Sequence, residues 1–112
     1  MSENDNPVLI YSTFPDLETA RNIGKGLIEA RLAACVNILP GMTSVYRWQG
    51  TIEDGQEVVM IIKTRRSLAA SVVDTVTDAH PYDVPAVVTV PVEGGFEPYL
   101  AWIMNETQPS AT

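Results

Sequence analysis

The sequence has few of the residues on which several common kinds of site depend. It contains one cysteine and one histidine, Cys35 and His80, which lie 45 positions apart. A single cysteine excludes a disulfide within the chain. Because no Cys-x-x-Cys or His-x-x-x-His spacing occurs, a dedicated zinc site is not expected. This cysteine usage predicts a cytoplasmic protein.

Basic residues are also scarce. The chain has 7 Lys and Arg against 14 Asp and Glu, which gives a net charge of −7 at pH 7. An acidic surface repels phosphate groups, so neither nucleic acid nor a membrane is expected as a partner. No apolar run approaches the roughly 20 residues that span a bilayer. The polar, acidic first six residues do not have the pattern of a signal peptide.

Motifs typical of common enzymes are missing. There is no Gly-x-Ser-x-Gly sequence and no glycine-rich phosphate-binding loop. A nucleophilic pair of Cys35 and His80 is formally possible, but no local signature accompanies either residue. We therefore predict that the protein is not an enzyme and requires no cofactor.

The sequence does contain one long apolar stretch, Cys35–Thr64, with the pattern of a β-hairpin. Its first arm, Cys35–Trp48, and its second arm, ending in Val58–Ile62, are rich in β-branched residues. Two turn signals lie between them, Gln49-Gly50 and Glu53-Asp54-Gly55.

The first arm is too long to fit straight inside a small domain. Fully extended, its 14 residues would span roughly 45 Å, whereas a domain of this length is roughly 34 Å across. The arm must therefore bend or project, and Pro40-Gly41 is the expected position of a bend or bulge. A projecting apolar hairpin indicates an oligomer.

Apolar periodicity and helix-breaking residues predict the remaining elements. Gly24 and Gly26, inside the first helix, are expected to allow its close approach to the sheet. The elements are a strand Val8–Thr13, a helix Leu17–Arg31 with Asp16 as N-cap, a helix capped by Ser67 and ending before Pro81, a strand Ala86–Val90, a helix Pro98–Asn105 burying Tyr99, Trp102 and Ile103, and a polar tail that frays from Thr107.

This order, β-α-β-β-α-β followed by a helix, predicts an α+β ferredoxin-like antiparallel sandwich with two helices on one face. We expect one domain over residues 1–112, with an ordered core from about residue 7 to residue 107. The strands Val58–Ile62 and Ala86–Val90 are apolar at consecutive positions, which is typical of strands buried on both faces. The face without helices should therefore pack against another subunit.

Several blocks resemble the CutA family of divalent-cation tolerance proteins. They are A-A-C-V-N-I-x-P-G at 33–41, S-x-Y-x-W-x-G-x-I-E at 44–53, E-V-x-M-I-I-K-T at 57–64, H-P-Y-D-V-P at 80–85 and Y-L-A-W-I at 99–103. The resemblance extends from Val8 to about Thr107. It implies a homotrimer assembled through the Cys35–Thr64 hairpin, with a role in tolerance to divalent metals.

The resemblance also implies candidate metal ligands. The positions proposed for copper in the family correspond to Cys35 and His80. Some members carry another cysteine just before T-x-P-D, where this chain has Ser12, so copper or another divalent cation is expected to bind weakly. The structural alternatives are that Cys35 is a small apolar residue of a strand and that His80 ends a helix. The internal methionines, Met42, Met60 and Met104, are expected in the core.

A second functional hypothesis is a small-molecule sensor. CutA proteins share a trimeric ferredoxin-like architecture with the PII signalling proteins, which implies a ligand in a cleft between subunits near Tyr46, Trp48, Lys63 and Tyr82. The alternatives are aromatic packing and an ion-paired Lys63. Relatives commonly have Glu where this chain has Ala86. A third hypothesis is a scaffold valued for a very stable assembly.

Overall fold

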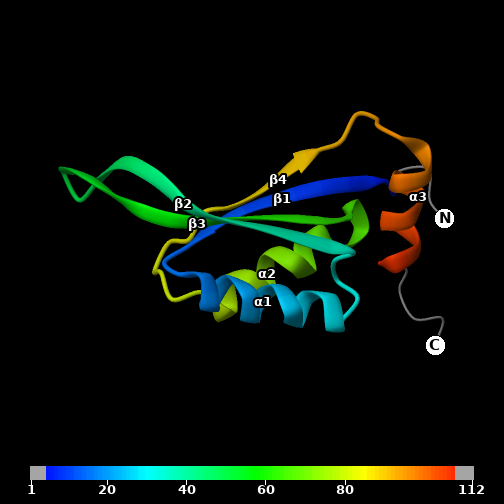
Figure 1. Ribbon diagram of the computed structural model, residues 1–112, viewed down its shortest axis with the longest axis horizontal. Coiled ribbons are helices and arrows are strands. Elements are labelled where there is room, and N and C mark those ends of the chain that lie inside the picture. The colour runs from blue at the N-terminus through cyan, green and yellow to red at the C-terminus, as the bar shows by residue number, and fades with distance from the viewer. Residues whose placement is uncertain (1–4, 108–112) are drawn as a thin grey trace.

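The computed structural model describes residues 5–107, and its elements follow the predicted order (Figure 1). The expected fraying beyond residue 107 lies outside this range. Thr107 itself is buried, so fraying from this residue is wrong. The elements are β1 (Pro7–Phe14), α1 (Leu17–Glu29), β2 (Cys35–Trp48), β3 (Thr51–Arg65), a short 3-10 turn (Arg66–Leu68), α2 (Ala69–Ala79), β4 (Val87–Pro91) and α3 (Glu97–Glu106).

The four strands form one antiparallel sheet in the order β2-β3-β1-β4. Helices α1 and α2 lie side by side under one face, while α3 lies at one end of the sheet (Figure 1). Alternate residues of the central strands point toward the two helices, because side chains alternate between the faces of a strand. The resulting core contains Ile10, Phe14, Leu27, Met60, Ile62, Val72 and Val76.

No helix of residues 5–107 covers the central part of the opposite sheet face (Figure 1). Apolar side chains on this face are exposed, including Leu39 at 56%, Val88 at 51% and Val90 at 43%. On β3, by contrast, Val59 and Met60 are adjacent in sequence and both buried. The apolar side chains of this sheet therefore lie on both faces, and only one face is covered by helices.

The β2–β3 hairpin projects beyond the helices and sets the longest dimension of the molecule, 47 Å (Figure 1). It reverses at Gln49-Gly50, whose φ angles of 50° and 83° suit a two-residue hairpin turn. The second predicted turn signal is wrong, because Asp54 pairs with Val45 inside the ladder. The turn at Gln49-Gly50 already reverses the chain, which leaves 53–55 free to continue as strand.

The predicted bend at Pro40-Gly41 is confirmed as a β-bulge. The pairing passes from Leu39–Val59 to Met42–Glu57, so two residues of β2 lie opposite one residue of β3. Gly41 has a φ of 85°, which a residue with a side chain rarely adopts.

The start of α1 and its approach to the sheet follow the prediction in part. The Asp16 carboxylate accepts a hydrogen bond from the Thr19 backbone N–H at 2.7 Å, which confirms the N-cap. A Cβ atom at Gly24 would lie 2.8 Å from Cγ2 of Val36, so close approach is confirmed there. It is wrong for Gly26, where such an atom would meet nothing within 4 Å.

The predicted cap of the second helix is wrong. Ser67 lies in the 3-10 turn, and α2 begins two residues later at Ala69. Ser67 instead donates from its backbone N–H and its hydroxyl to the Asp5 carboxylate, at 3.1 and 2.9 Å. Asp5 also forms an ion pair with the buried Arg65 at 2.9 Å. A contact distant in sequence therefore outcompetes the local cap.

Helix α3 buries less aromatic surface than predicted. Ile103 is buried, whereas Tyr99 and Trp102 are 40% and 41% exposed, so their predicted burial is wrong within the single chain. The two rings stack on each other with centroids 5.5 Å apart, and the Tyr99 hydroxyl accepts a hydrogen bond from Lys63 of β3. Arg65 ties the helix to β3 by donating to Thr107 Oγ1 and to the Met104 carbonyl.

Candidate functional site

A cavity of about 670 Å³ lies where the hairpin leaves the sheet. We call it the hairpin pocket. Three strands and the segment between α2 and β4 line it. The residues that matter for its chemistry are four aromatics and two acids: Tyr11, Tyr46, Trp48, Tyr82, Glu57 and Asp83.

The bulge decides which side chains of β2 reach this pocket. In an uninterrupted ladder, alternation from Leu39 would place Arg47 on the uncovered sheet face, and would place Tyr46 and Trp48 on the opposite face. The extra residue at Pro40-Gly41 reverses this alternation, so Tyr46 and Trp48 lie on the same face as Glu57. Both aromatic residues line the pocket.

Tyr82 and Glu57 form the central polar contact of the pocket. The Tyr82 hydroxyl donates a hydrogen bond to Oε2 of Glu57 at 3.0 Å. Burial, together with the hydrogen bond to the Glu57 carboxylate, raises the pKa of Tyr82 to about 12. The phenol therefore stays neutral and holds the carboxylate in one position.

His80 holds the backbone of Tyr82 in place through a hydrogen bond. Its Nδ1 accepts a hydrogen bond from the Tyr82 backbone N–H at 3.1 Å, so Nδ1 carries no proton. The proton is then on Nε2, which donates to the Thr13 carbonyl at 2.7 Å. The ring also stacks on Phe14, with centroids 4.7 Å apart. Both ring nitrogens of His80 are thus engaged, since Nε2 is bonded to Thr13 and Nδ1 holds the Tyr82 backbone.

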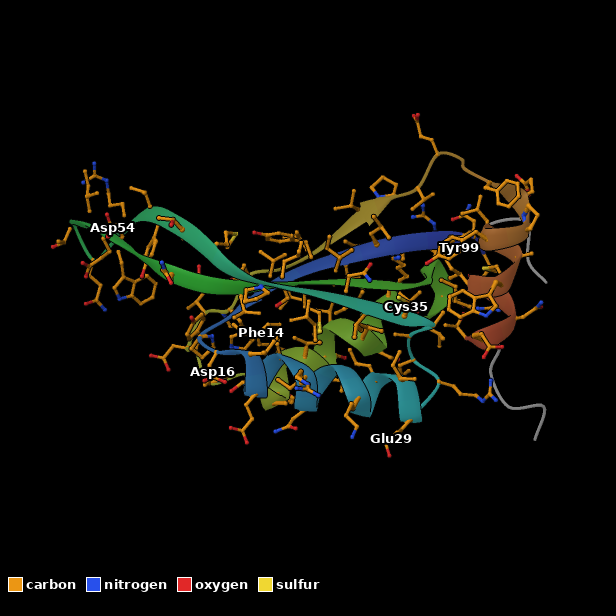
Figure 2. The ribbon with its side chains drawn as sticks, viewed as in Figure 1. Phe14, Asp16, Glu29, Cys35, Asp54 and Tyr99 are labelled. Atoms are coloured by element: carbon orange, nitrogen blue, oxygen red, sulfur yellow. The ribbon has the colours of Figure 1, made fainter. Side chains whose placement is uncertain are left out.

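Cys35 lies at the other end of β2, beside Lys63. His80 stacks on Phe14, which pairs with Val58. Val58 and Lys63 are five positions apart on β3, which corresponds to about 16 Å, and Figure 2 shows Cys35 and Phe14 well apart along the sheet. The two predicted copper ligands therefore do not meet within one chain.

The rest of residues 5–107 offers no alternative metal cluster, since no group of three or more His, Cys, Asp or Glu is close enough to hold an ion. The residues of a single chain therefore do not fit the joint copper site that the family resemblance implies. A metal ion at His80 would also have to replace one of the two hydrogen bonds of its ring.

Lys63 is not part of the hairpin pocket. It lies six residues from Glu57 along β3, or about 20 Å, and donates a hydrogen bond to the Tyr99 hydroxyl at 2.8 Å. That hydrogen bond raises the pKa of Lys63, although partial burial opposes the shift. The structure thus brings together three of the four predicted ligand-binding residues and places the fourth with α3.

The helices of residues 5–107 are all too short or too polar to cross a membrane.

Comparison with known proteins gives the same family as the sequence blocks. The family model described as "CutA1 divalent ion tolerance protein" matches residues 8–106. The chain belongs to this family. It is 43% identical over 99 residues to the divalent-cation tolerance protein CutA of Thermus thermophilus, which covers 88% of this chain and 96% of that protein.

Two plant relatives extend the comparison. The chain is 41% identical over 101 residues to "Protein CutA, chloroplastic" of Arabidopsis thaliana, covering 90% of this chain. This chain spans 56% of that relative's length. The crystal structure of CutA1 from Oryza sativa superposes with a TM-score of 0.90 at 40% identity, over 97% of this chain and 100% of that one. The resemblance to the CutA family is therefore confirmed.

Some pocket residues were not predicted from the sequence. Glu57, Tyr11 and Asp83 line the pocket, and only the register of the sheet shows that they meet Tyr46 and Tyr82. The block H-P-Y-D-V-P contains Tyr82 and Asp83 and was a usable signal for the latter. To predict that Tyr11 and Glu57 lie beside Tyr46 in the pocket, one would have needed the location and size of the bulge.

Proposed function

We propose that this protein acts in tolerance to divalent cations, as a homotrimer. The observation that carries the proposal is the family match over residues 8–106, together with the name of the Thermus thermophilus relative. The test is growth at raised copper of a bacterial strain whose own family member has been deleted. Expression of this chain should restore growth, and equal growth with and without it would contradict the proposal.

The exposed apolar surface supports the oligomer. The uncovered sheet face and the projecting hairpin both carry exposed apolar side chains, including Val45 at 69% and Ile52 at 64%, and exposed apolar surface of this kind marks sites of association. The strand order and the pair of helices on one face support the ferredoxin-like description. The family resemblance supplies the number three.

Copper binding is a separate proposal. Because Cys35 and His80 do not meet in one chain, the thiol of Cys35 is the better candidate, as a soft ligand that copper favours. Calorimetric titration with copper, zinc and nickel tests it. Saturable copper binding tighter than about 1 μM, or roughly 8 kcal/mol, that disappears in Cys35→Ser would support the proposal. Equal weak binding of all three metals, unchanged in Cys35→Ser and His80→Ala, would contradict it.

The hairpin pocket favours a second candidate function, that of a small-molecule-binding trimer comparable to the PII proteins. Its volume lies within the roughly 300–1,000 Å³ of ligand pockets, and it combines an apolar wall with a fixed polar contact. In the trimer we place the pocket at the subunit boundary, because Tyr46 and Trp48 are half exposed in the single chain.

A cytoplasmic location stays a prediction of the sequence, and the Arabidopsis relative is described as chloroplastic.

A further inference from the structure

We propose that the hairpin pocket binds an organic cation, an ammonium ion that carries apolar substituents. This inference rests on the second candidate function and gives its ligand a chemical class.

Within one chain, the charged residues that line the pocket all have one sign. Glu57 and Asp83 are the ionisable acids that line it, and none of the lining residues, all of them within residues 5–107, is Lys, Arg or His. The whole chain also carries a net charge of −7. A cation entering the pocket would be attracted, whereas a carboxylate or phosphate ligand would meet two negative charges without a counterion.

The bulge that brings Tyr46 and Trp48 into the pocket also directs Arg47 away from it. Arg47 lies between Tyr46 and Trp48 in the sequence and pairs with Ile52 across the ladder. The alternation of side chains directs it to the opposite face of the hairpin. Tyr46 and Trp48 therefore line the pocket, whereas Arg47 does not.

The walls are suited to a weakly hydrated cation. Tyr11, Tyr46, Trp48 and Tyr82 all line the pocket, and aromatic rings attract ammonium groups through their negative faces. Aromatic residues with a nearby carboxylate form the usual recognition site for methylated ammonium ions. The apolar part of such a ligand would be buried by the same rings.

The acceptor is fixed before any ligand arrives. Glu57 uses Oε2 to accept from the neutral Tyr82 phenol, and His80 in turn holds the Tyr82 backbone. A carboxylate has further lone pairs for a ligand N–H or for a purely electrostatic contact. Because the pair is already ordered, little conformational entropy remains to be lost on binding.

A metal ion is a poorer match for this pocket. Calcium takes six to eight oxygen ligands and magnesium demands an octahedral set, while no cluster of three acids, histidines or cysteines occurs in residues 5–107. Aromatic walls provide no such ligands. The chemistry of the pocket thus separates an organic cation from a divalent metal.

Choline and its uncharged isostere 3,3-dimethyl-1-butanol provide a direct test, because they share shape and differ in charge. Binding to the full-length protein would be followed by the fluorescence of Trp48, in a Trp102→Phe background that removes the other tryptophan. We expect saturable binding of choline and at least about tenfold weaker binding of the isostere, a difference of about 1.4 kcal/mol.

Glu57→Gln should weaken choline binding by about tenfold while retaining an oxygen acceptor for Tyr82. Glu29→Gln is the matched control, since it removes the same charge from the exposed end of α1, away from the hairpin (Figure 2). An equal loss in both variants would reduce the effect to net charge and overturn the proposal. Equal affinity for choline and the isostere would also overturn it.

Two further outcomes separate this inference from the function on which it rests. Succinate binding at Trp48, with no binding of choline, would overturn the cationic class and leave the small-molecule function standing. If choline, the isostere and succinate all fail to bind at millimolar concentrations, both the inference and the second candidate function are wrong.

Discussion

Gly24 and Gly26 lie two residues apart on α1 but have opposite surroundings. A Cβ atom at Gly24 would lie 2.8 Å from Val36 Cγ2 and 3.2 Å from Met60 Sδ, whereas one at Gly26 would meet open space. Gly24→Ala should therefore destabilise the protein by about 1–3 kcal/mol through overpacking. Gly26→Ala should stabilise it by about 0.5–1 kcal/mol, because Ala is the better helix former.

Urea denaturation at one fixed protein concentration would measure both variants. Each is the other's control, since the chemical change is identical and both glycines are in the same helix. Equal effects of the two substitutions would show that α1 does not pack against β2 and β3 as described.

Asp5 is the counterion of Arg65, whose side chain is 5% exposed. Burial opposes ionisation of Asp5, but hydrogen bonds from Ser67 and the interaction with Arg65 outweigh it and hold its pKa below the usual 3.8. Asp5→Ala should destabilise the protein by about 1–3 kcal/mol at pH 7, since a buried charged donor loses an acceptor. The free energy of unfolding measures this loss.

The pH dependence of this effect has a defined sign. Because folding lowers the pKa of Asp5, its contribution is complete above pH 3.8 and is lost as the pH falls through the lower folded pKa. The difference in stability between wild type and Asp5→Ala should therefore shrink as the pH is lowered below about 4. Asp74→Ala, at an exposed position of α2, should change stability by less than about 0.5 kcal/mol. A difference that grows with acid would refute this assignment.

At the scale of elements, the bulge in β2 is the feature on which the pocket depends. Gly41 has a φ of 85° and faces open space, so a side chain there is opposed by the backbone conformation and not by a clash. Gly41→Ala should cost about 1–2 kcal/mol and weaken binding at the pocket. Gly55→Ala, in β3 and also in open space without a positive φ, should be neutral or slightly stabilising.

Thermal unfolding and Trp48 fluorescence would compare these two variants. An unchanged midpoint and unchanged fluorescence in Gly41→Ala would mean that the hairpin keeps its register without a left-handed residue at position 41.

Much of the arrangement of helices and strands was predictable from the sequence. Breaker residues and apolar periodicity gave the order of the elements, and Pro40-Gly41 marked the bulge. The predictions were wrong where a contact between residues distant in sequence replaces a local one. For example, Ser67 donates a hydrogen bond to Asp5 and does not cap α2. Glu53-Asp54-Gly55 has the composition of a turn, but an earlier turn had already reversed the chain.

The site was less predictable than the fold, for a physical reason. Tyr46, Trp48 and Tyr82 were identified as a group, but the alternation of side chains beyond a bulge depends on how many residues it contains. Lys63 shares a strand with Glu57, yet the two residues are six positions apart along the extended chain. Strand membership alone therefore could not place it.

For the molecule as a whole, the uncovered sheet face is the surface that we propose to be covered by other copies of the chain. Ile61 is on this face, in the central strand β3, where it pairs with Tyr11 and Asn37. Ile61→Asp would bury an unpaired charge in the proposed interface, so it should dissociate the oligomer or unfold the protein. Light scattering and melting would measure this, with Ile28→Asp on the exposed side of α1 as the control. Unchanged mass and melting in Ile61→Asp would contradict the interface.

The proposed homotrimer is tested by measuring the mass of the purified, tag-free protein with sedimentation equilibrium at micromolar concentration. We predict a single species with the mass of three 12.2 kDa chains, since exposed apolar side chains on the uncovered sheet face and the hairpin favour association and the family resemblance supplies the number three. A species of 12.2 kDa across this concentration range would contradict it. The exposed apolar face would then be a property of the free protein, and the proposed homotrimer would be wrong.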